Sequence, residues 1–142
     1  MVIYLIQGVF FQDREILDYA PFTGPVVVSL LAKEMFVGVL ELNTENSALP
    51  TTGFIIDRYD EADLTEIVLD GNLLSFTKKY RNRGHHDTIR CTYVLLPDGS
   101  WYGEWIKEGE GAVVLDSGES HCILTEVDKS FFDSTAKNVV EA

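Results

Sequence analysis

The sequence has little cysteine and no long apolar run. Its two cysteines, Cys91 and Cys122, are too few for a disulfide framework, and each lies inside a β-like apolar segment. We therefore expect both to be buried thiols in a reducing compartment. No segment approaches the roughly 18 to 20 apolar residues that a membrane helix requires. The apolar segment Met1–Phe11 lacks a basic leader and a cleavage site, so it indicates a strand rather than a signal peptide.

Basic residues are also scarce, since 11 Lys and Arg face 23 Asp and Glu and leave a formal net charge of −12. Phosphate backbones and anionic membranes repel such a protein, so we expect neither nucleic acid nor a membrane as a partner. With no export signal in the sequence, the expected location is the cytoplasm.

Catalytic motifs are missing as well. The sequence has no glycine-rich phosphate loop, no serine nucleophile elbow and no Cys-x-x-Cys pair. Asp57, Asp60 and Glu61 are sequence neighbours, which does not place two carboxyl groups across a cleft as a glycosidase requires. His121 directly precedes Cys122, but adjacent strand residues point to opposite faces. We assign no catalytic residue and no cofactor, and whether the protein is an enzyme stays open.

Apolar and aromatic residues are plentiful: 46% of the chain is hydrophobic, with eight Phe, six Tyr and two Trp. This composition and a length of 142 residues predict one globular domain with a single core. Short segments of alternating apolar and polar residues recur without a long helical pattern between them. The predicted fold class is all-β, an antiparallel up-and-down β-barrel of about eight to ten strands over residues 1–127. A short helical or disordered tail is expected over residues 128–142.

Turn residues bound the expected strands. The strands are Met1–Phe11, Pro25–Ala32, Met35–Leu42, Thr52–Tyr59, Leu64–Leu69, Asn72–Tyr80, Thr88–Leu96, Ser100–Lys107, Ala112–Leu115 and Ser120–Val127. Asp70-Gly71 and Pro97-Asp98-Gly99 predict two tight hairpin turns, because glycine accepts a positive φ and proline presets φ. Gln12–Tyr19 is predicted to form a helical turn or two before Pro21, and Asn43–Pro50 a loop.

Aromatic residues and glycines follow a hairpin rhythm from about Gly53 to Val127. The residues that carry this rhythm are Gly53, Asp57, Tyr59 and Ala62, the segment Leu74–Tyr80, and the segment Trp101–Trp105. In these features the chain resembles the calycin barrels, which include lipocalin, fatty-acid-binding and avidin-like proteins. It departs from the lipocalin pattern, because no Gly-x-Trp opens the first strand. The resemblance implies a central cavity for an apolar or amphipathic small molecule.

Aromatic residues at alternate positions of neighbouring strands predict a common wall inside the barrel. One interpretation is core packing, since large apolar residues at strand spacing usually fill the interior. The other is that they line a cavity, because a barrel of about eight strands can hold one small molecule. The predicted ligand-binding residues are Phe76, Tyr80, Tyr93, Trp101 and Trp105.

Five of the 11 basic residues lie between Lys78 and Arg90, where Asp87 is the only acid. We expect this segment to form an exposed positive edge suited to a phosphate or a carboxylate. The predicted anion-binding residues are Lys78, Arg81, Arg83, His85 and Arg90. His85 and His86 also invite a metal, but consecutive histidines rarely face one ion and nearby bases oppose a cation, so no metal ligand is assigned.

Three functions remain open from the sequence. The leading hypothesis is a non-catalytic barrel that binds a small molecule, either apolar or anionic. The first alternative is an interaction protein with a packed core that uses the basic segment as its binding surface. The second alternative is an enzyme that acts inside the barrel. A hollow interior would favour the first hypothesis, and a filled one would favour the interaction protein.

Overall fold

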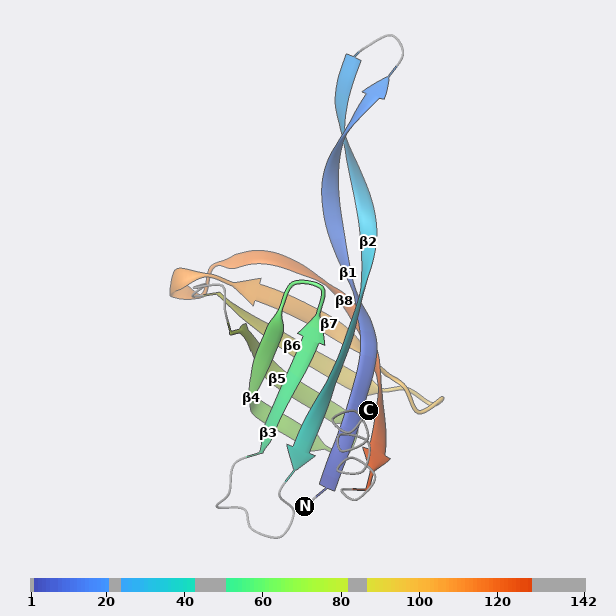
Figure 1. Ribbon diagram of the computed structural model, residues 1–142, viewed down its shortest axis with the longest axis vertical. Helices are drawn as coiled ribbons and strands as arrows, with labels where there is room; N and C mark the ends of the chain where they lie inside the picture. Colours follow the sequence, from blue (N-terminus) through green and yellow to red (C-terminus); the bar gives the residue numbers. More distant parts are fainter. Residues whose placement is uncertain (1, 21–23, 43–50, 82–86, 129–142) are drawn as a thin grey trace, which may run out of the picture.

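The computed structural model describes residues 2–20, 24–42, 51–81 and 87–128, although not the side chains of 14–20 and 24–30. These residues form eight strands and one short 3-10 turn, Glu110–Ala112. The strands are β1 Val2–Ala20, β2 Gly24–Leu42, β3 Thr52–Asp57, β4 Glu61–Asp70, β5 Leu73–Tyr80, β6 Thr88–Leu95, β7 Trp101–Glu108 and β8 Val114–Val127. Each strand pairs antiparallel with the next, and β8 pairs with β1, so the sheet closes into an up-and-down barrel (Figure 1). The predicted fold class is confirmed.

The first two strands are far longer than the barrel needs. β1 and β2 have 19 residues each and extend past the barrel as a two-stranded arm (Figure 1). From Phe11 to Ala20, the only described strand that pairs with β1 is β2. The helical turn predicted for Gln12–Tyr19 is therefore wrong, as is the break predicted between Ala32 and Met35. Continuous backbone pairing with a valine-rich partner outweighs a weak local preference for helix.

Both predicted hairpins are present. Gly71 and Asn72 join β4 to β5, one residue further along the chain than predicted, and Gly71 has the positive φ of 57° that a tight turn favours. Residues 96–100 join β6 to β7, and there Gly99 has a φ of 88°. The two last predicted strands form one strand, β8, whose pairing with β7 shifts register beside Glu108.

Alternating strand directions give the barrel two unlike ends. At the arm end, β1 and β2 leave the barrel and β3, β5 and β7 finish; the turn end holds the two tight hairpins. The buried residues that fill the half nearer the turn end include Ile6, Leu40, Leu74, Trp101 and Cys122. This half is the packed part of the core, and the arm half contains the candidate site.

Within the described part of the chain, no helix has the length and the apolar character needed to cross a bilayer. Of the predicted tail, only Asp128 is described. The loop predicted over Asn43–Pro50 also lies outside the described residues.

Candidate functional site

A cavity of about 160 Å³ lies inside the arm half of the barrel. Its wall is mainly aromatic, and the rings that line it are Phe10, Phe36, Tyr59, Phe76, Tyr80, Tyr93 and Trp105. A dry cavity of about 150 Å³ is large enough to bind benzene. The interior of this barrel therefore has room for a molecule built on one six-membered ring.

Two of the wall aromatics lie directly over glycines on the neighbouring strand. Phe36 is paired with Gly8, where an added Cβ would come within 2.6 Å of the phenyl ring. Trp105 is paired with Gly118, where an added Cβ would come within 2.7 Å of the indole nitrogen. That nitrogen donates a hydrogen bond to the carbonyl oxygen of Phe11 at 3.0 Å. The missing side chains let both rings lie against the barrel wall, and space remains in front of them.

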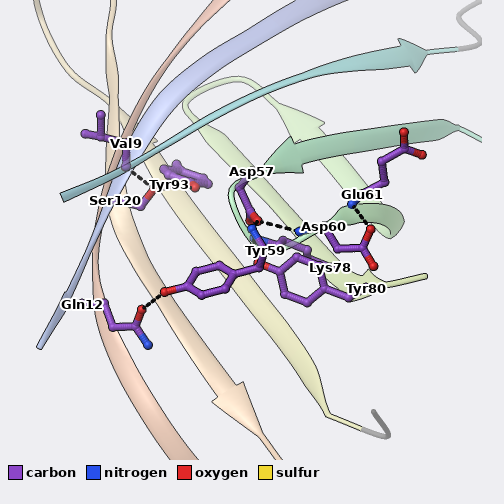
Figure 2. A network of polar contacts seen from close by, with 10 residues as sticks. All are labelled: Val9, Gln12, Asp57, Tyr59, Asp60, Glu61, Lys78, Tyr80, Tyr93 and Ser120. Carbon is purple, nitrogen blue, oxygen red and sulfur yellow. Dashed lines mark hydrogen bonds and ion pairs between the residues drawn. The ribbon is translucent and has the colours of Figure 1, made fainter. Parts of the chain in front are cut away.

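A buried ion pair places one charge, that of Lys78, in the cavity wall (Figure 2). The other charged residues that line the cavity are Asp87 and Lys107, whose partly exposed side chains lie 3.8 Å apart. Lys78 Nζ lies 2.7 Å from Asp57 Oδ2, and only 7% of the Lys78 side chain and none of the Asp57 side chain is exposed. Tyr80 Oη donates to the same oxygen at 2.5 Å. The backbone amides of Tyr59 and Asp60 donate to Asp57 Oδ1 at 2.8 and 3.3 Å. All acceptor positions of this carboxylate are therefore in use.

The electrostatics of the pair keep Asp57 ionised. Burial raises the pKa of its carboxyl group, but the charge of Lys78 and the hydrogen bonds from Lys78, Tyr80 and Tyr59 outweigh it and hold the pKa below the ordinary 3.8. The Lys78 ammonium also lies 5.1 Å from the ring centroid of Phe10 and 4.7 Å from that of Tyr80, within the range of cation–π attraction. The cation is therefore fixed in place from three sides.

The hydroxyl and amide side chains of the wall are hydrogen-bonded within the protein. Tyr59 Oη donates to Gln12 Oε1 at 3.0 Å, and Ser120 Oγ donates to the carbonyl oxygen of Val9 at 2.9 Å (Figure 2). Tyr93 Oη lies 2.8 Å from Ser120 Oγ. Because the single hydroxyl proton of Ser120 goes to Val9, Tyr93 is the donor to Ser120.

The two cysteines are buried thiols, as predicted. Burial raises the pKa of Cys91, which lines the cavity, to about 11, although the charge of Lys78 acts in the opposite direction. Burial, with a smaller contribution from Cys91, raises the pKa of Cys122 to about 12. Burial likewise raises the pKa of Tyr93 well above its ordinary value. At neutral pH these groups are neutral, and neither thiol is an activated nucleophile.

Four of the five predicted ligand-binding residues meet at the cavity: Phe76, Tyr80, Tyr93 and Trp105. The fifth, Trp101, also points into the barrel but is buried in the packed half, with 6% of its surface exposed. The alternation on β5, β6 and β7 predicted these orientations correctly. Ligand binding by these residues stays a prediction.

The predicted anion-binding residues do not form one exposed patch. Lys78 is buried inside the barrel, so the prediction that it lies at an exposed edge is wrong. Arg81 bonds to Asp63 and Glu61 on the outer surface, and Arg90 bonds to Glu108. The other two predicted residues, Arg83 and His85, lie outside the described residues, as does His86. Anion binding itself stays a prediction.

Sequence reasoning named Lys78 but placed it at an exposed edge, and it missed other residues of the site. The inward direction of Lys78 was predictable, because it alternates with Phe76 and Tyr80 along β5 and must share their inward face. Nothing comparable identified its partner Asp57, which comes from β3, because that contact depends on how three strands align. The wall residues Phe10 and Phe36 were likewise missed, since nothing in their sequence separates cavity from core.

No protein-family model matches the chain, and no curated protein sequence matches it either.

Proposed function

We propose that this protein binds one small, mainly apolar molecule in the arm half of its barrel, without catalysing a reaction. The observation that carries the proposal is the cavity of about 160 Å³ behind an aromatic wall. Protein interiors normally leave few voids larger than a water molecule, so space of this size is unusual unless something occupies it. A small apolar ligand would recover the dispersion contacts that the wall lacks.

The chemistry of the wall supports binding rather than catalysis. A general base works best with a pKa near the operating pH, whereas Asp57 has a lowered pKa. Cys91 and Tyr93 have raised pKa values, which leave both protonated at neutral pH. The likeness to calycin barrels, in the closed sheet of eight antiparallel strands, fits this role, and we extend the proposal to a calycin-like binding protein. A solidly packed barrel, the premise of the interaction-protein alternative, fits the cavity less well.

The two tryptophans provide a test within one molecule. Trp105 lines the cavity and Trp101 lies in the packed half, so a ligand in the cavity should shift the indole N–H signal of Trp105 in a ¹H–¹⁵N NMR spectrum and leave that of Trp101 in place. Titration of the unmodified protein with ethylbenzene, a one-ring apolar probe, is the experiment. The variant Trp101→Phe assigns the two signals.

A cavity-filling variant gives the matched control. Ile89 lines the cavity, and Ile89→Phe would place a larger side chain in it. We expect this variant to lose the ethylbenzene response while it keeps the native spectrum elsewhere. If the Trp105 signal does not move at saturating probe, or if Ile89→Phe binds ethylbenzene as well as the unmodified protein does, the proposal is wrong.

A further inference from the structure

Most buried polar groups at the cavity already have hydrogen-bond partners within the protein, and Asp57 is the first of them. Asp57 accepts four hydrogen bonds, from Lys78 at 2.7 Å, Tyr80 at 2.5 Å, and the amides of Tyr59 and Asp60 at 2.8 and 3.3 Å (Figure 2). A carboxylate offers about four lone-pair positions. It has none left for a donor on a ligand.

The other buried polar side chains of the wall are committed in the same way. Asp87 and Lys107 also line the cavity, but their side chains are 27% and 40% exposed and pair with each other at 3.8 Å. The Trp105 indole donates to Phe11, and the Tyr93 and Ser120 hydroxyls form a chain that ends on Val9. Each of these donor protons already has an acceptor in the protein. A ligand would have to break an existing hydrogen bond to use any of them.

Lys78 is the exception among the buried polar side chains of the wall. An ammonium group carries three N–H donors, and among the described residues Lys78 donates a hydrogen bond to Asp57 alone. The rings of Phe10 and Tyr80 lie beside the cation and attract its charge, but they are not oxygen or nitrogen acceptors. Lys78 lines the cavity with 7% of its side chain exposed, so its remaining donors are held in a small, largely apolar space.

We propose that the ligand of this cavity is an uncharged one-ring molecule whose single acceptor group, such as a ketone or amide carbonyl, accepts a hydrogen bond from Lys78. This inference deepens the function proposed above and rests on it. A hydrogen bond from a charged donor is stronger than one from a neutral donor, so this contact favours a ligand that carries the acceptor.

The ligand should be uncharged because the pair of Lys78 and Asp57 is already neutral as a unit. A carboxylate placed against that pair would be a third buried charge without a counterion of its own, which is costly. A cationic ligand would face the Lys78 ammonium, and Asp57 has no free lone pair to receive it. The partly exposed pair of Asp87 and Lys107 adds no net charge to the cavity. The buried charges therefore select against both kinds of ion at Lys78.

Four probes of similar size separate these cases: ethylbenzene without an acceptor, acetophenone with a neutral one, benzoate as an anion and benzylammonium as a cation. We expect acetophenone to bind the unmodified protein about tenfold more tightly than ethylbenzene, as one added hydrogen bond to a charged donor would give. Benzoate and benzylammonium should bind more weakly than ethylbenzene. The dissociation constants are measured from the Trp105 indole signal.

A double variant links the preference to Lys78. Asp57→Asn with Lys78→Met removes both charges together. This double variant should bind acetophenone and ethylbenzene with about equal affinity. Lys79→Met is the matched control, because Lys79 is the neighbouring, exposed residue of β5, and it should keep the preference. The probe series on the unmodified protein tests the inference by itself if the double variant does not fold.

The possible outcomes distinguish a failure of the proposed ligand class from a failure of the proposed function. Equal affinity for acetophenone and ethylbenzene, tighter binding of benzoate, or a preference that survives in the folded double variant would overturn the assignment of ligand class while leaving cavity binding intact. If none of the four probes binds, the proposed function fails and this inference fails with it.

Discussion

The two halves of the barrel are built from the same strands and are filled differently. In the turn half, inward positions carry large apolar side chains such as Leu40, Leu74 and Trp101, which are almost or fully buried. In the arm half, Phe36 and Trp105 lie over Gly8 and Gly118 against the wall, and space remains in front of them. The contrast shows that aromatic residues at inward positions do not by themselves fill a barrel. Whether space remains depends also on the size of the residue paired with each ring on the neighbouring strand.

Polarity divides the two halves as well. Among the described residues, the buried charged side chains lie in the arm half, where Lys78 pairs with Asp57. A buried pair of this kind adds little net stability compared with well-packed apolar side chains. It does give the arm half a fixed polar group, which an apolar core cannot supply. We therefore expect the turn half to contribute more to stability, and the arm half contains the candidate site.

The largest difference that we predict between the two halves comes from the ion pair. Lys78→Met leaves the buried Asp57 without its counterion and should lower the free energy of unfolding by about 3 to 5 kcal/mol. Asp57→Asn with Lys78→Met removes both charges and should restore most of that loss. Urea unfolding curves measure both, with Lys79→Met as a control that should change stability by about 0.5 kcal/mol or less. Equal losses in the single and double variants would show that packing, not charge, is responsible.

The two tryptophans allow a direct comparison of the two halves, because both are 6% exposed and both lie on the inward face of β7. Trp101→Ala opens a new hole in a packed region and should cost about 3 to 5 kcal/mol. Trp105→Ala only enlarges an existing cavity, so we expect a smaller loss even though its hydrogen bond to Phe11 also disappears. Urea unfolding of the two variants gives the ranking. A larger loss for Trp105→Ala would mean that the arm half is packed as tightly as the turn half.

Larger side chains should also destabilise the turn half more than the arm half. Leu74 is fully buried in the packed half, and Leu74→Phe should destabilise by about 1 to 3 kcal/mol because the surrounding side chains have no room to move. Ile89 lines the cavity, so Ile89→Phe should lower the free energy of unfolding by less than Leu74→Phe does. Thermal unfolding followed by circular dichroism measures both. Equal penalties at the two positions would argue that the cavity is closed by side-chain rearrangement in solution.

How far the sequence predicts this molecule depends on whether a feature is local. The hairpin at Gly99 was predictable, because its turn residues and the strand alternation on both sides agree. The arm was not: its second segment has the β-branched residues of a strand, but Gln12–Tyr19 becomes strand only through pairing with β2. A contact between distant segments cannot be read from either segment alone.

The site divides along the same line. Alternation along β5 places Phe76, Lys78 and Tyr80 on one face, which is enough to predict a wall but not a cavity. The cavity depends on Gly118 standing opposite Trp105, which requires the register between β7 and β8. The charge count around Lys78 was misleading for the same reason, because its partner Asp57 is 21 residues away in the sequence.

The smallest effect we predict is the pH dependence that the ion pair contributes to stability. The folded-state pKa of Asp57 is held below its ordinary 3.8, because Lys78 and the hydrogen bonds outweigh the opposing effect of burial. Above that ordinary value, Asp57 is ionised in both the folded and the unfolded chain, so its contribution is fully present and does not change with pH. As pH falls below it, the unfolded chain takes up a proton first, and the contribution is lost as pH passes through the lowered folded-state pKa.

The many other carboxylates of this acidic chain titrate in the same range, so the measurement is the difference in unfolding free energy between the unmodified protein and the variant with Asp57→Asn and Lys78→Met. That difference should be constant from neutral pH down to about pH 5 and should then shift against the unmodified protein. A difference that stays flat through acid pH, or that moves in favour of the unmodified protein, would mean that Asp57 is not held ionised by Lys78 and that the arm half lacks the fixed charge pair on which its comparison with the turn half depends.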